Sequence, residues 1–520
     1  MMGVGKSSAG ALLAARLGVP FVDSDRLIEQ EAGQSIADLF HQQGEATFRA
    51  IERTFVTRQL ADPTPRVVAL GGGSLLDRSL RLQVIDTAIL LTLEAPVTEL
   101  QRRAAHHPGQ RPLLAGDPDR LTTLLAQRHD AYTEAHALLD TSGRSVEQVA
   151  DELLRLVHEA DLAVALGTRS YPVRVSRGPS FWQRTLADLA PSSGLVVLDS
   201  EVDRLHGEHI ASSLPPGRWS RTVLPPGEAA KNPATLASLW ATLHDRAVDR
   251  RGMVLAIGGG VTTDLGGLAA ATWLRGVRWV AMPTTLLGAV DAAVGGKTAI
   301  DLGTSKNMVG VVHQPAAVCI DLALLATEPA RGFASGMAEV VKTALIGDAS
   351  LFDLLERSFA GVAEGSDPRE RLPAATLTEV IRRAVAVKAR IVSRDEHEQG
   401  ERRVLNLGHT LGHALEAHGG FDRWTHGEAV ALGMVAALRI GESLGVTEPG
   451  LTSRVTALLA GLGLPHVLDP AEVAAALPWL QHDKKRDDTE LRYVLVTRPG
   501  QPLIRSLPVA ELASRLRELR

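Results

Sequence analysis

Residues 253–260 read MVLAIGGG and indicate the fold class of the greater part of this chain. A short apolar run that ends in glycines is typical of a buried strand in a parallel sheet, followed by a tight turn. Glycines at such a turn allow the backbone to approach a pyrophosphate, and the N-terminus of the next helix favours its negative charge. The spacing differs from the G-x-G-x-x-G of dinucleotide-binding folds, so on this stretch alone a purely structural turn remains the alternative.

Short apolar runs of the same kind alternate with longer helical patterns as far as about Ala330. Examples of the short runs are residues 67–70, 88–93, 195–198 and 277–282. Such alternation predicts βαβ units with parallel sheets and helices on both faces. After Ala330 the pattern changes to long helical stretches, such as 376–391 and 426–444. We therefore predict an α/β protein that ends in a mostly helical domain.

Three domains are expected from these changes of pattern. The apolar residues of 146–157 have helical spacing, as in a helix that closes a domain, and residues 162–166 then begin a new strand. A chain of 520 residues is also too long for one compact core to be expected. The predicted domains are an α/β domain at 1–160, a second α/β domain at 161–330 and the helical domain at 331–520.

The composition, with 45% hydrophobic and 22% charged residues, is that of a globular enzyme. A formal net charge of -5 gives no reason to expect nucleic acid as a partner, although local basic clusters could bind phosphorylated metabolites. The single cysteine, Cys319, excludes an internal disulfide and fits a reducing compartment. No apolar run reaches the roughly 18 residues that span a bilayer, and the first residues lack a signal-peptide pattern. We therefore expect a cytoplasmic protein that does not contact membranes.

Gly5-Lys6-Ser7, which precedes an apolar helical pattern, is the second half of a P-loop. In a P-loop, backbone N–H groups hold phosphates, the lysine reaches the β and γ oxygens, and the serine ligates magnesium. Three residues alone often occur by chance, but suitable carboxylates and arginines follow them. Asp25 comes after a strand-like run, Arg49 lies in a helical pattern, and a second glycine-rich turn occupies residues 71–73.

This combination of motifs resembles shikimate kinase over nearly all of residues 1–158. The resemblance implies that ATP and magnesium are bound by Gly3, Gly5, Lys6 and Ser7, with Ser7 on the magnesium ion. The shikimate contacts that it implies are Asp25, Arg49, Gly72, Gly73 and Arg128. Asp25 would orient or deprotonate the attacking hydroxyl, and Arg111 would be the lid arginine over the transferring phosphate. Phosphoryl transfer needs such charge neutralisation and alignment more than covalent help. The alternative for Asp25 and Arg49 is a surface ion pair.

The P-loop is incomplete in this sequence. In the full pattern G-x-x-x-x-G-K-[ST], the first glycine would stand one position before Met1, and the central strand that precedes the loop is absent with it. Each buried backbone group that loses its partner in a sheet costs about 1–3 kcal/mol. Either the start is assigned too late, or this domain is a degenerate kinase that only stabilises its partner. We expect the former.

The segments after residue 260 extend the first motif in a specific order. They read VTTD at 261–264, MPTTLL at 282–287 and VDAAVGGKTAID at 290–301, followed by Lys306-Asn307. Together they resemble 3-dehydroquinate synthase, and the resemblance extends from about residue 161 to about 515. The NAD contacts that it implies are Asp199, Glu228, Lys231, Gly259, Gly260, Asp264, Thr284, Thr285 and Lys306. The substrate contacts that it implies here are Asp291, Lys297 and Asn307; the alternative for Lys297 is a solvated lysine.

Metal ligands are expected in the helical part. GMAEVVK at 336–342 places Glu339 and Lys342 on one helical face, and NLGHTLGH at 406–413 places His409 and His413 four residues apart. Spacing alone nominates His409 and His413 as a ligand pair. The resemblance instead implies that Glu339, His409 and His426 hold zinc or cobalt, with His413 on the phosphate side of the substrate. One carboxylate and two imidazoles suit a catalytic metal with open positions, and the residues themselves leave both ligand sets possible.

Basic residues cluster around these motifs. The further polar or cationic contacts implied by the resemblance are Lys342, Lys388, Arg402, Asn406 and Lys485, with Lys484 as an alternative to the last. Arg275 would reach the phosphate across the interface of a homodimer. The alternative for these charges is a mixed, solvated surface. The sequence departs from the family at Gly332, where family members commonly have glutamate, so the geometry before Glu339 is in doubt.

The resemblances imply two activities. The synthase would convert 3-deoxy-D-arabino-heptulosonate 7-phosphate to 3-dehydroquinate and phosphate with NAD and zinc or cobalt, and the kinase would phosphorylate shikimate with ATP and magnesium. A related sugar-phosphate cyclase and a zinc polyol dehydrogenase are the rivals for the synthase activity. A neutral polyol needs no cationic pocket, so Lys342, Lys388 and Arg402 argue against the dehydrogenase.

Overall fold

A computed structural model describes residues 3–105, 120–159, 162–303, 305–362, 367–481 and 490–519 of the chain. The chain divides into two compact units, Met1–Pro172 and Val173–Arg520. The alternation of strands and helices predicted from the sequence is present in both units. The predicted boundary near residue 160 falls between α7 (Val146–Glu159) and β5 (Leu162–Val164).

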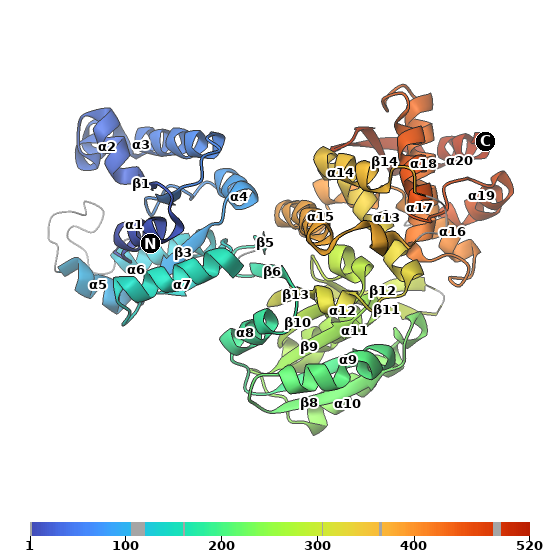
Figure 1. Cartoon of the computed structure of the whole chain (residues 1–520), viewed down its shortest axis with the longest axis horizontal. Coiled ribbons are helices and arrows are strands. Elements are labelled where there is room, and N and C mark those ends of the chain that lie inside the picture. The colour runs from blue at the N-terminus through green and yellow to red at the C-terminus, as the bar shows by residue number, and fades with distance from the viewer. Residues whose placement is uncertain are drawn as a thin grey trace. The chain divides into compact units, whose positions relative to one another are not determined.

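The first unit consists of short parallel strands and the helices that cover them (Figure 1). Its paired strands are β1 (Phe21–Asp23), β2 (Val67–Ala69), β3 (Leu91–Glu94) and β4 (Ala137–Asp140). Its other helices are α1 (Lys6–Leu17), α2 (Ser24–Ala32), α3 (Ile36–Ala61), α4 (Arg78–Thr87), α5 (Val97–Ala105) and α6 (Arg120–Thr133). Among the described residues, β1 pairs with β2 and β3 with β4, both in parallel, as two separate sheets.

Local sequence explains where several of these helices begin. The side chain of Asp23 accepts hydrogen bonds from the backbone N–H groups of Asp25 and Arg26 at the start of α2, and Ser35 caps α3 in the same way. Such side-chain caps satisfy N–H groups that have no partner within the helix. Gly5 precedes α1 with a φ of 86°, a left-handed conformation that glycine adopts without steric cost.

The second unit is built on one central parallel sheet. Its strands are β6 (Tyr171–Ser176), β7 (Gly194–Asp199), β8 (Trp219–Leu224), β9 (Met253–Gly258), β10 (Arg278–Pro283) and β13 (Ala317–Asp321). They lie in the order β6-β13-β10-β9-β7-β8, and each neighbouring pair is parallel. The chain leaves β7 toward β8 on one side and leaves β9 toward β10 on the other. The carboxyl ends of β7 and β9 therefore flank a topological switch point, where open α/β sheets bind ligands.

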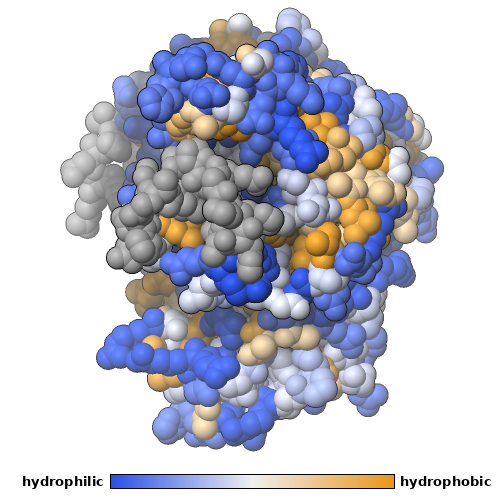
Figure 2. All heavy atoms as spheres, turned by 90° about the vertical axis from the view of Figure 1, so that its left-hand side faces the viewer, coloured by the Kyte–Doolittle hydropathy of each residue, from blue (hydrophilic) through white to orange (hydrophobic). Residues whose placement is uncertain are grey.

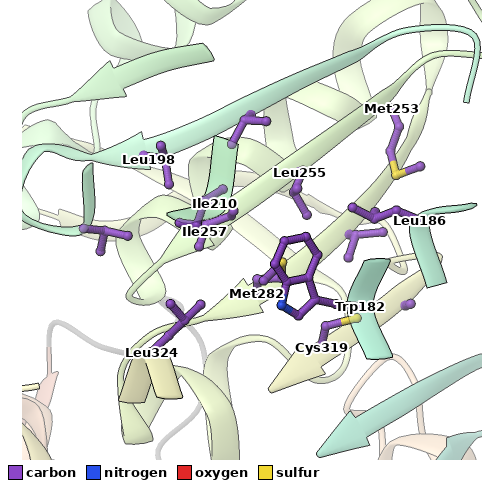
Figure 3. Packing of buried hydrophobic residues seen from close by; sticks show 14 of the residues in the cluster. Trp182, Leu186, Leu198, Ile210, Met253, Leu255, Ile257, Met282, Cys319 and Leu324 are labelled. Carbon is purple, nitrogen blue, oxygen red and sulfur yellow. The ribbon is translucent and has the colours of Figure 1, made fainter. Parts of the chain in front are cut away.

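The core of this sheet is continuous and apolar (Figure 3). Trp182 packs beside Cys319 and Met282 in this cluster, and its indole N–H donates to Oδ2 of Asp321 at 3.2 Å. The strand that carries the glycine turn, β9, is buried at every position, as the apolar run in its sequence predicts. The glycine turn at its end is therefore held by a rigid layer.

Helices and two hairpins complete the second unit. The helices before residue 330 are α8 (Ser180–Leu189), α9 (Ser200–Ser213), α10 (Pro233–Asp245), α11 (Gly260–Thr272) and α12 (Leu322–Leu325). Those after it are α13 (Ala330–Gly347), α14 (Ala349–Phe359), α15 (Ala374–Arg394), α16 (His409–His418), α17 (His426–Ser443), α18 (Leu451–Gly461), α19 (Pro470–Ala476) and α20 (Val509–Glu518). Figure 1 shows this second set gathered apart from the sheet, in yellow to red. The antiparallel hairpins are β11–β12 (Lys297–Leu302 and Ser305–Val312) and β14–β15 (Glu490–Arg498 and Gln501–Pro508).

The surface drawn in Figure 2 is largely hydrophilic and is interrupted by smaller apolar patches. Among the described residues, no helix combines the length and the hydropathy that crossing a membrane would require.

Candidate active sites

The glycine turn after β9 lies at the carboxyl edge of the sheet, where α11 begins. Gly259 is the N-cap residue of α11, and the backbone N–H of Thr284 donates to the carbonyl oxygen of Gly258 at 3.0 Å. A Cβ atom on Gly259 would lie 3.4 Å from Cγ2 of Thr285, so this threonine packs beside the turn. The structure thus brings together Gly259, Gly260, Thr284 and Thr285, all predicted nucleotide contacts. The N-terminus of α11 favours a bound anion at this place.

Asp199 ends the neighbouring strand β7 and begins helix α9. Its Oδ1 accepts hydrogen bonds from the backbone N–H groups of Glu201 and Val202 at 3.0 and 2.9 Å. Because β7 lies next to β9 in parallel register, Asp199 stands at the same edge as the glycine turn. The structure adds a helix-capping role to the predicted nucleotide contact.

Lys231 contacts another predicted nucleotide contact, Asp264, and a predicted substrate contact, Asn307. Its side chain is buried, its Nζ lies 2.6 Å from Oδ2 of Asp264, and it donates a hydrogen bond to Oδ1 of Asn307. Burial raises the pKa of Asp264 to about 6, although the charge of Lys231 opposes the shift. Asn307 has a φ of 57°, and its backbone N–H is held by Oδ1 of Asp301 at 2.8 Å. Through Asn307, the β11–β12 hairpin contacts Lys231 and so lies beside the predicted nucleotide contacts.

Glu339, His409 and His426 come from three different helices and converge. Glu339 lies in the middle of α13, and the two histidines are the first residues of α16 and α17. Oε1 of Glu339 lies 3.7 Å from Nε2 of His409 and 3.5 Å from Nε2 of His426. The three side chains form a group that could hold a metal ion. Each histidine directly follows the N-cap residue of its helix, Gly408 for α16 and Thr425 for α17.

The chemistry of this group fits a divalent cation. Glu339 is 1% exposed, and among the described residues neither of its carboxylate oxygens accepts a hydrogen bond of normal geometry, although Lys342 forms an ion pair with Oε2. A buried carboxylate is costly unless its charge is compensated. The Nδ1 atom of His409 is engaged by the carbonyl oxygen of Leu407 at 3.1 Å, which directs its Nε2 toward Glu339. Such orientation by a second partner is usual for histidines that bind metals.

His413 lies beside this group and belongs to a second one. Its ring centroid is 5.2 Å from that of His409 and 6.1 Å from that of His426. His413, Glu416 and His426 also satisfy the geometry of a possible metal group. This second group shares His426 with the first and was not considered from the sequence, and neither group joins His409 to His413, the pair that spacing alone nominates.

Lys388 and Lys342, both buried, form a charged cluster with the partly exposed Asp291 next to the possible metal group. Nζ of Lys388 lies 2.5 Å from Oδ1 of Asp291, and Nζ of Lys342 lies 3.9 Å from the same oxygen. Burial lowers the pKa of Lys388 to about 8, against the opposing effect of Asp291. Burial would raise the pKa of Asp291, but the charges of the two lysines outweigh it and lower this pKa. The structure thus places these three predicted residues together.

Glu398 is a residue of this site that the sequence analysis did not single out. It pairs with Lys297, and its Oε1 accepts a hydrogen bond from Nδ2 of Asn406 at 2.6 Å. Its φ of 58° is uncommon for a residue other than glycine. Arg402 lies nearby in the chain, is buried, and donates from Nη2 to the carbonyl oxygen of Gly295 at 3.4 Å. The acidic residues at 395, 396 and 398, which lie shortly before Arg402 in the chain, were the sequence signal that could have identified Glu398.

Arg275 is not brought to this site within its own chain. It follows α11, which begins at the glycine turn and continues for 13 residues before it. At 1.5 Å per residue, Arg275 stands about 20 Å from the glycine turn. Arg111 and Lys485, with the alternative Lys484, lie outside the described residues.

The side chain of Glu328 lies against Gly332, the position at which the family commonly has glutamate. A Cβ atom on Gly332 would lie 2.9 Å from Oε1 of Glu328. Oε2 of Glu328 accepts a hydrogen bond from the backbone N–H of Leu286 at 2.8 Å. The Glu328 side chain therefore links the segment after Thr285 to the start of α13, one helical turn before Gly332. Burial raises the pKa of Glu328 to about 7.

In the first unit, the predicted shikimate contacts surround the glycine turn at 71–73. A Cβ atom on Gly73 would lie 2.2 Å from Nη1 of Arg49, and Nη1 of Arg128 donates to the carbonyl oxygen of Gly72 at 3.5 Å. Asp25 stands on the same side, since a Cβ atom on Gly71 would lie 2.9 Å from its Oδ1. Burial raises the pKa of Asp25, while the charge of Lys6 opposes this shift. The sequence analysis missed one member of this cluster, the buried Glu52.

Glu52 pairs with Arg49 and accepts a hydrogen bond from Oγ of Ser74 at 2.6 Å. Its position three residues after Arg49 in α3 was the only sequence signal for this contact. The surface ion pair considered as the alternative for Asp25 and Arg49 is not seen among the described contacts of Arg49, which pairs with Glu45 and Glu52.

The P-loop residues border a cavity of about 680 Å³. Gly3 and Gly5 line it together with Arg103 and Thr141, which follow β3 and β4, respectively. Arg103 donates from Nη2 to the carbonyl oxygen of Thr141 at 3.1 Å. The sequence analysis missed Arg103 and Thr141, although residues after parallel strands gather at one edge of a sheet.

The comparisons with known proteins match both units. Models for the N-terminal and C-terminal parts of 3-dehydroquinate synthase match residues 221–335 and 336–486, and the model for shikimate kinase matches residues 2–158. The 3-dehydroquinate synthase of Azotobacter vinelandii is 42% identical over 346 residues, which make up 66% of this chain and 92% of that protein.

Two solved structures are similar to the second unit. ValA, a 2-epi-5-epi-valiolone synthase from Streptomyces hygroscopicus subsp. jinggangensis with NAD+ and Zn2+ bound, is 31% identical with a TM-score of 0.58, covering 67% of this chain and 96% of that one. A 2-deoxy-scyllo-inosose synthase complexed with carbaglucose-6-phosphate, NAD+ and Co2+ is 23% identical with a TM-score of 0.57, covering 69% and 99%. At that identity the second likeness shows the fold alone. This chain therefore belongs to the 3-dehydroquinate synthase family, and its residues 2–158 are a shikimate kinase domain.

Proposed function

We propose that the second unit converts 3-deoxy-D-arabino-heptulosonate 7-phosphate to 3-dehydroquinate and phosphate, and that the first phosphorylates shikimate with ATP. Within the synthase, residues 161–330 would bind NAD, and residues 331–520 would bind the metal and most of the substrate. The observation that supports the synthase most is the convergence of Glu339, His409 and His426 beside Lys342 and Lys388. A carboxylated and phosphorylated substrate needs this positive charge.

The bound cation and NAD would supply two parts of the chemistry, the polarisation of a hydroxyl oxygen and a reversible acceptor for hydride. Glu339, His409 and His426 are the residues that fit zinc or cobalt. The NAD+ and Zn2+ found in the valiolone synthase support this choice of partners. The glycine turn at 259–260 and the N-terminus of α11 fit the pyrophosphate of NAD.

The charged residues of the chain would hold the substrate and manage its protons. Lys388 and Lys342, both buried, would neutralise the anionic groups, while Asp291 keeps the two lysines at fixed positions. Glu398 pairs with Lys297 and accepts a hydrogen bond from Asn406. These two residues would contact substrate hydroxyls. His413 would stand on the phosphate side, and Arg402 would add positive charge. Hydride returns to the substrate within one turnover, so NADH does not accumulate.

In the kinase, magnesium and ATP would supply the phosphoryl group and neutralise its charge. Gly3, Gly5 and Lys6 would hold the phosphates, and Ser7 would ligate magnesium. Asp25, whose pKa is raised by burial, is placed to take the proton of the attacking hydroxyl. Arg49 and Arg128 border the glycine turn and would bind the shikimate carboxylate. Arg111 would close over the transferring phosphate.

A homodimer in the cytoplasm is the quaternary state and location that we propose. Arg275 stands about 20 Å from the glycine turn of its own chain, and the family resemblance would place it on the phosphate in a partner's site. Strand β12 exposes four apolar side chains, Met308, Val309, Val311 and Val312, with Met308 66% exposed. A contact between two copies would cover such a surface.

The test is to assay the purified chain for both activities. We expect phosphate release from the heptulosonate phosphate with no net change in absorbance from NADH, and ATP-dependent phosphorylation of shikimate. NADH that accumulates during turnover would show a dehydrogenase instead. The kinase is tested separately: absence of ATP-dependent phosphorylation of shikimate would refute the kinase proposal, whatever the result for the synthase.

A further inference from the structure

His426 is contacted on both of its ring nitrogens by buried carboxylates. Its Nε2 lies 3.5 Å from Oε1 of Glu339, and its Nδ1 lies 3.3 Å from Oε2 of Glu416. The side chain of Glu416 is 5% exposed. An imidazole that binds a metal through one nitrogen carries its proton on the other, where a carboxylate can accept it.

This geometry separates the two possible metal groups. If Nε2 of His426 faces the cation together with Glu339 and His409, Nδ1 carries a proton and Glu416 accepts it. If the cation instead lies with His413 and Glu416, Nε2 must carry the proton, and Glu339, the more buried of the two carboxylates, loses the metal and is left with the ammonium of Lys342 and this N–H. The first arrangement compensates both carboxylates, so Glu416 is a partner of His426 and not itself a ligand.

Oε2 of Glu416 contacts His426, and its other carboxylate oxygen, Oε1, contacts Lys306. Nζ of Lys306 lies 3.5 Å from Oε1 of Glu416 and 3.8 Å from Oε1 of Glu228. The same ammonium stands 4.5 Å from the ring centroid of Phe421. Lys306 thus contacts two carboxylates: that of Glu416, which contacts His426, and that of Glu228, a predicted nucleotide contact. The distances of 3.5 and 3.8 Å are long for charge-assisted hydrogen bonds, so its position can shift between them.

We propose that Glu416 is a positioning residue for His426 and that Lys306 couples nucleotide binding to metal binding through it. The proposal rests on the proposed function, which puts the metal at Glu339, His409 and His426 and NAD beside Glu228. A bound pyrophosphate attracts Lys306 away from Glu416. The carboxylate of Glu416 then accepts the Nδ1 proton more strongly, and His426 becomes a better donor to the cation. Nucleotide and metal therefore each tighten the binding of the other by the same factor.

Cobalt binding to the metal-free full chain tests the first part, because the visible absorption of bound Co2+ reports both affinity and geometry. We expect Glu416→Gln to weaken Co2+ binding about 10-fold and Glu416→Ala up to about 100-fold, with an altered spectrum, as for other partners of metal-bound histidines. Glu428→Gln is the matched control. Glu428 lies two residues after His426 and caps the same helix, but it pairs with Arg331, so this variant should lose stability and keep the Co2+ affinity.

Two outcomes distinguish a failure of this proposal from a failure of the metal site. If His426→Ala and His409→Ala abolish Co2+ binding while Glu416→Ala leaves it unchanged, the metal site stands and the role of Glu416 is refuted. If His409→Ala also leaves binding unchanged, the proposed metal site itself is wrong. His413→Ala should bind Co2+ with nearly normal affinity, and a loss as large as that of His409→Ala would assign His413 as a ligand and overturn the proposal.

The second part is tested by repeating the Co2+ titration with saturating NAD+. In the natural sequence we expect NAD+ to tighten Co2+ binding at least about fivefold, within the usual range of coupling between sites. In Lys306→Met the ratio of the affinities with and without NAD+ should fall to one, while Co2+ still binds. A ratio that is unchanged in Lys306→Met, or equal to one in the natural sequence, would overturn the coupling.

Discussion

The buried Lys388 and the partly exposed Asp291 form an ion pair in which Nζ and Oδ1 lie 2.5 Å apart. The lysine comes from α15, and the aspartate comes from the segment between β10 and β11. Lys342 approaches the same aspartate from α13. Three separate parts of the chain thus meet at one carboxylate, where the substrate anion would bind, and Lys342 also pairs with Glu339.

The pH dependence of the synthase should reflect Lys388. Burial lowers its pKa to about 8, from an ordinary 10.5, so the lysine loses its proton as the pH rises through about 8 and the pocket loses positive charge. We expect kcat/KM for the heptulosonate phosphate to fall above this pH. Lys388→Arg should move the fall to higher pH, because arginine stays protonated, with a lower maximum rate. The shikimate kinase activity of the same chain is the internal control. An alkaline limb that is unchanged in Lys388→Arg would assign it to another group.

Glu328 should make the stability of the second unit depend on pH. Burial raises its pKa from 4.5 to about 7 in the folded state, so the folded state binds the proton more tightly than the unfolded state does. The stabilisation is complete below pH 4.5 and is lost as the pH rises through 7. The loss amounts to about 3 kcal/mol. Glu328→Gln should remove this dependence and keep the acceptor for Leu286.

Tryptophan fluorescence during urea unfolding can measure this effect in the full chain. All 7 tryptophans of the chain lie after residue 180, in the second unit, so they report its unfolding selectively. The urea midpoint of the natural sequence should fall from pH 5 to pH 8 relative to that of Glu328→Gln. If the urea midpoints of the natural sequence and of Glu328→Gln change by the same amount between pH 5 and pH 8, Glu328 is already ionised in the folded protein at pH 5.

The two activities should respond differently to a chelator of soft metals. Phenanthroline binds zinc and cobalt through nitrogen atoms, whereas magnesium prefers oxygen ligands. We expect it to abolish the synthase activity and leave the kinase activity within about twofold, since the kinase needs only magnesium. Added Zn2+ should restore the synthase. Loss of both activities together would instead indicate that metal removal destabilises the whole chain.

The sequence predicted the fold well because hydrophobic periodicity is local information. The apolar run before Gly258 and the long helical patterns after Ala330 each appear as elements of the expected type. The hairpin β14–β15 was not singled out, although β14 contains a buried apolar run at residues 493–496, because this short run follows long helical patterns. The domain limits and the roles of the individual site residues remain predictions.

The candidate site depends on contacts that local patterns do not contain. Glu339 and His426 are 87 positions apart and meet only because α13 packs against α17; the family resemblance suggested the set, and spacing favoured His413. Glu398, Glu416 and Glu52 were missed for a related reason. Each is an acid whose importance comes from the cation or imidazole that the fold places against it.

The glycine turn of the kinase should be intolerant of even one methyl group. A Cβ atom on Gly73 would lie 2.2 Å from Nη1 of Arg49, so Gly73→Ala must displace the guanidinium. Loss of one charged hydrogen bond costs about 1.5–3 kcal/mol, which is about a 10- to 100-fold weaker binding of shikimate. Calorimetric titration with shikimate measures this change directly. Gly44→Ala is the matched control. Its φ of 80° makes alanine strained there, but its Cβ would meet nothing within 4 Å, so it should cost stability and leave shikimate binding unchanged. Equal weakening in both variants would mean that Gly73→Ala acts through general destabilisation and that Arg49 is not a shikimate contact.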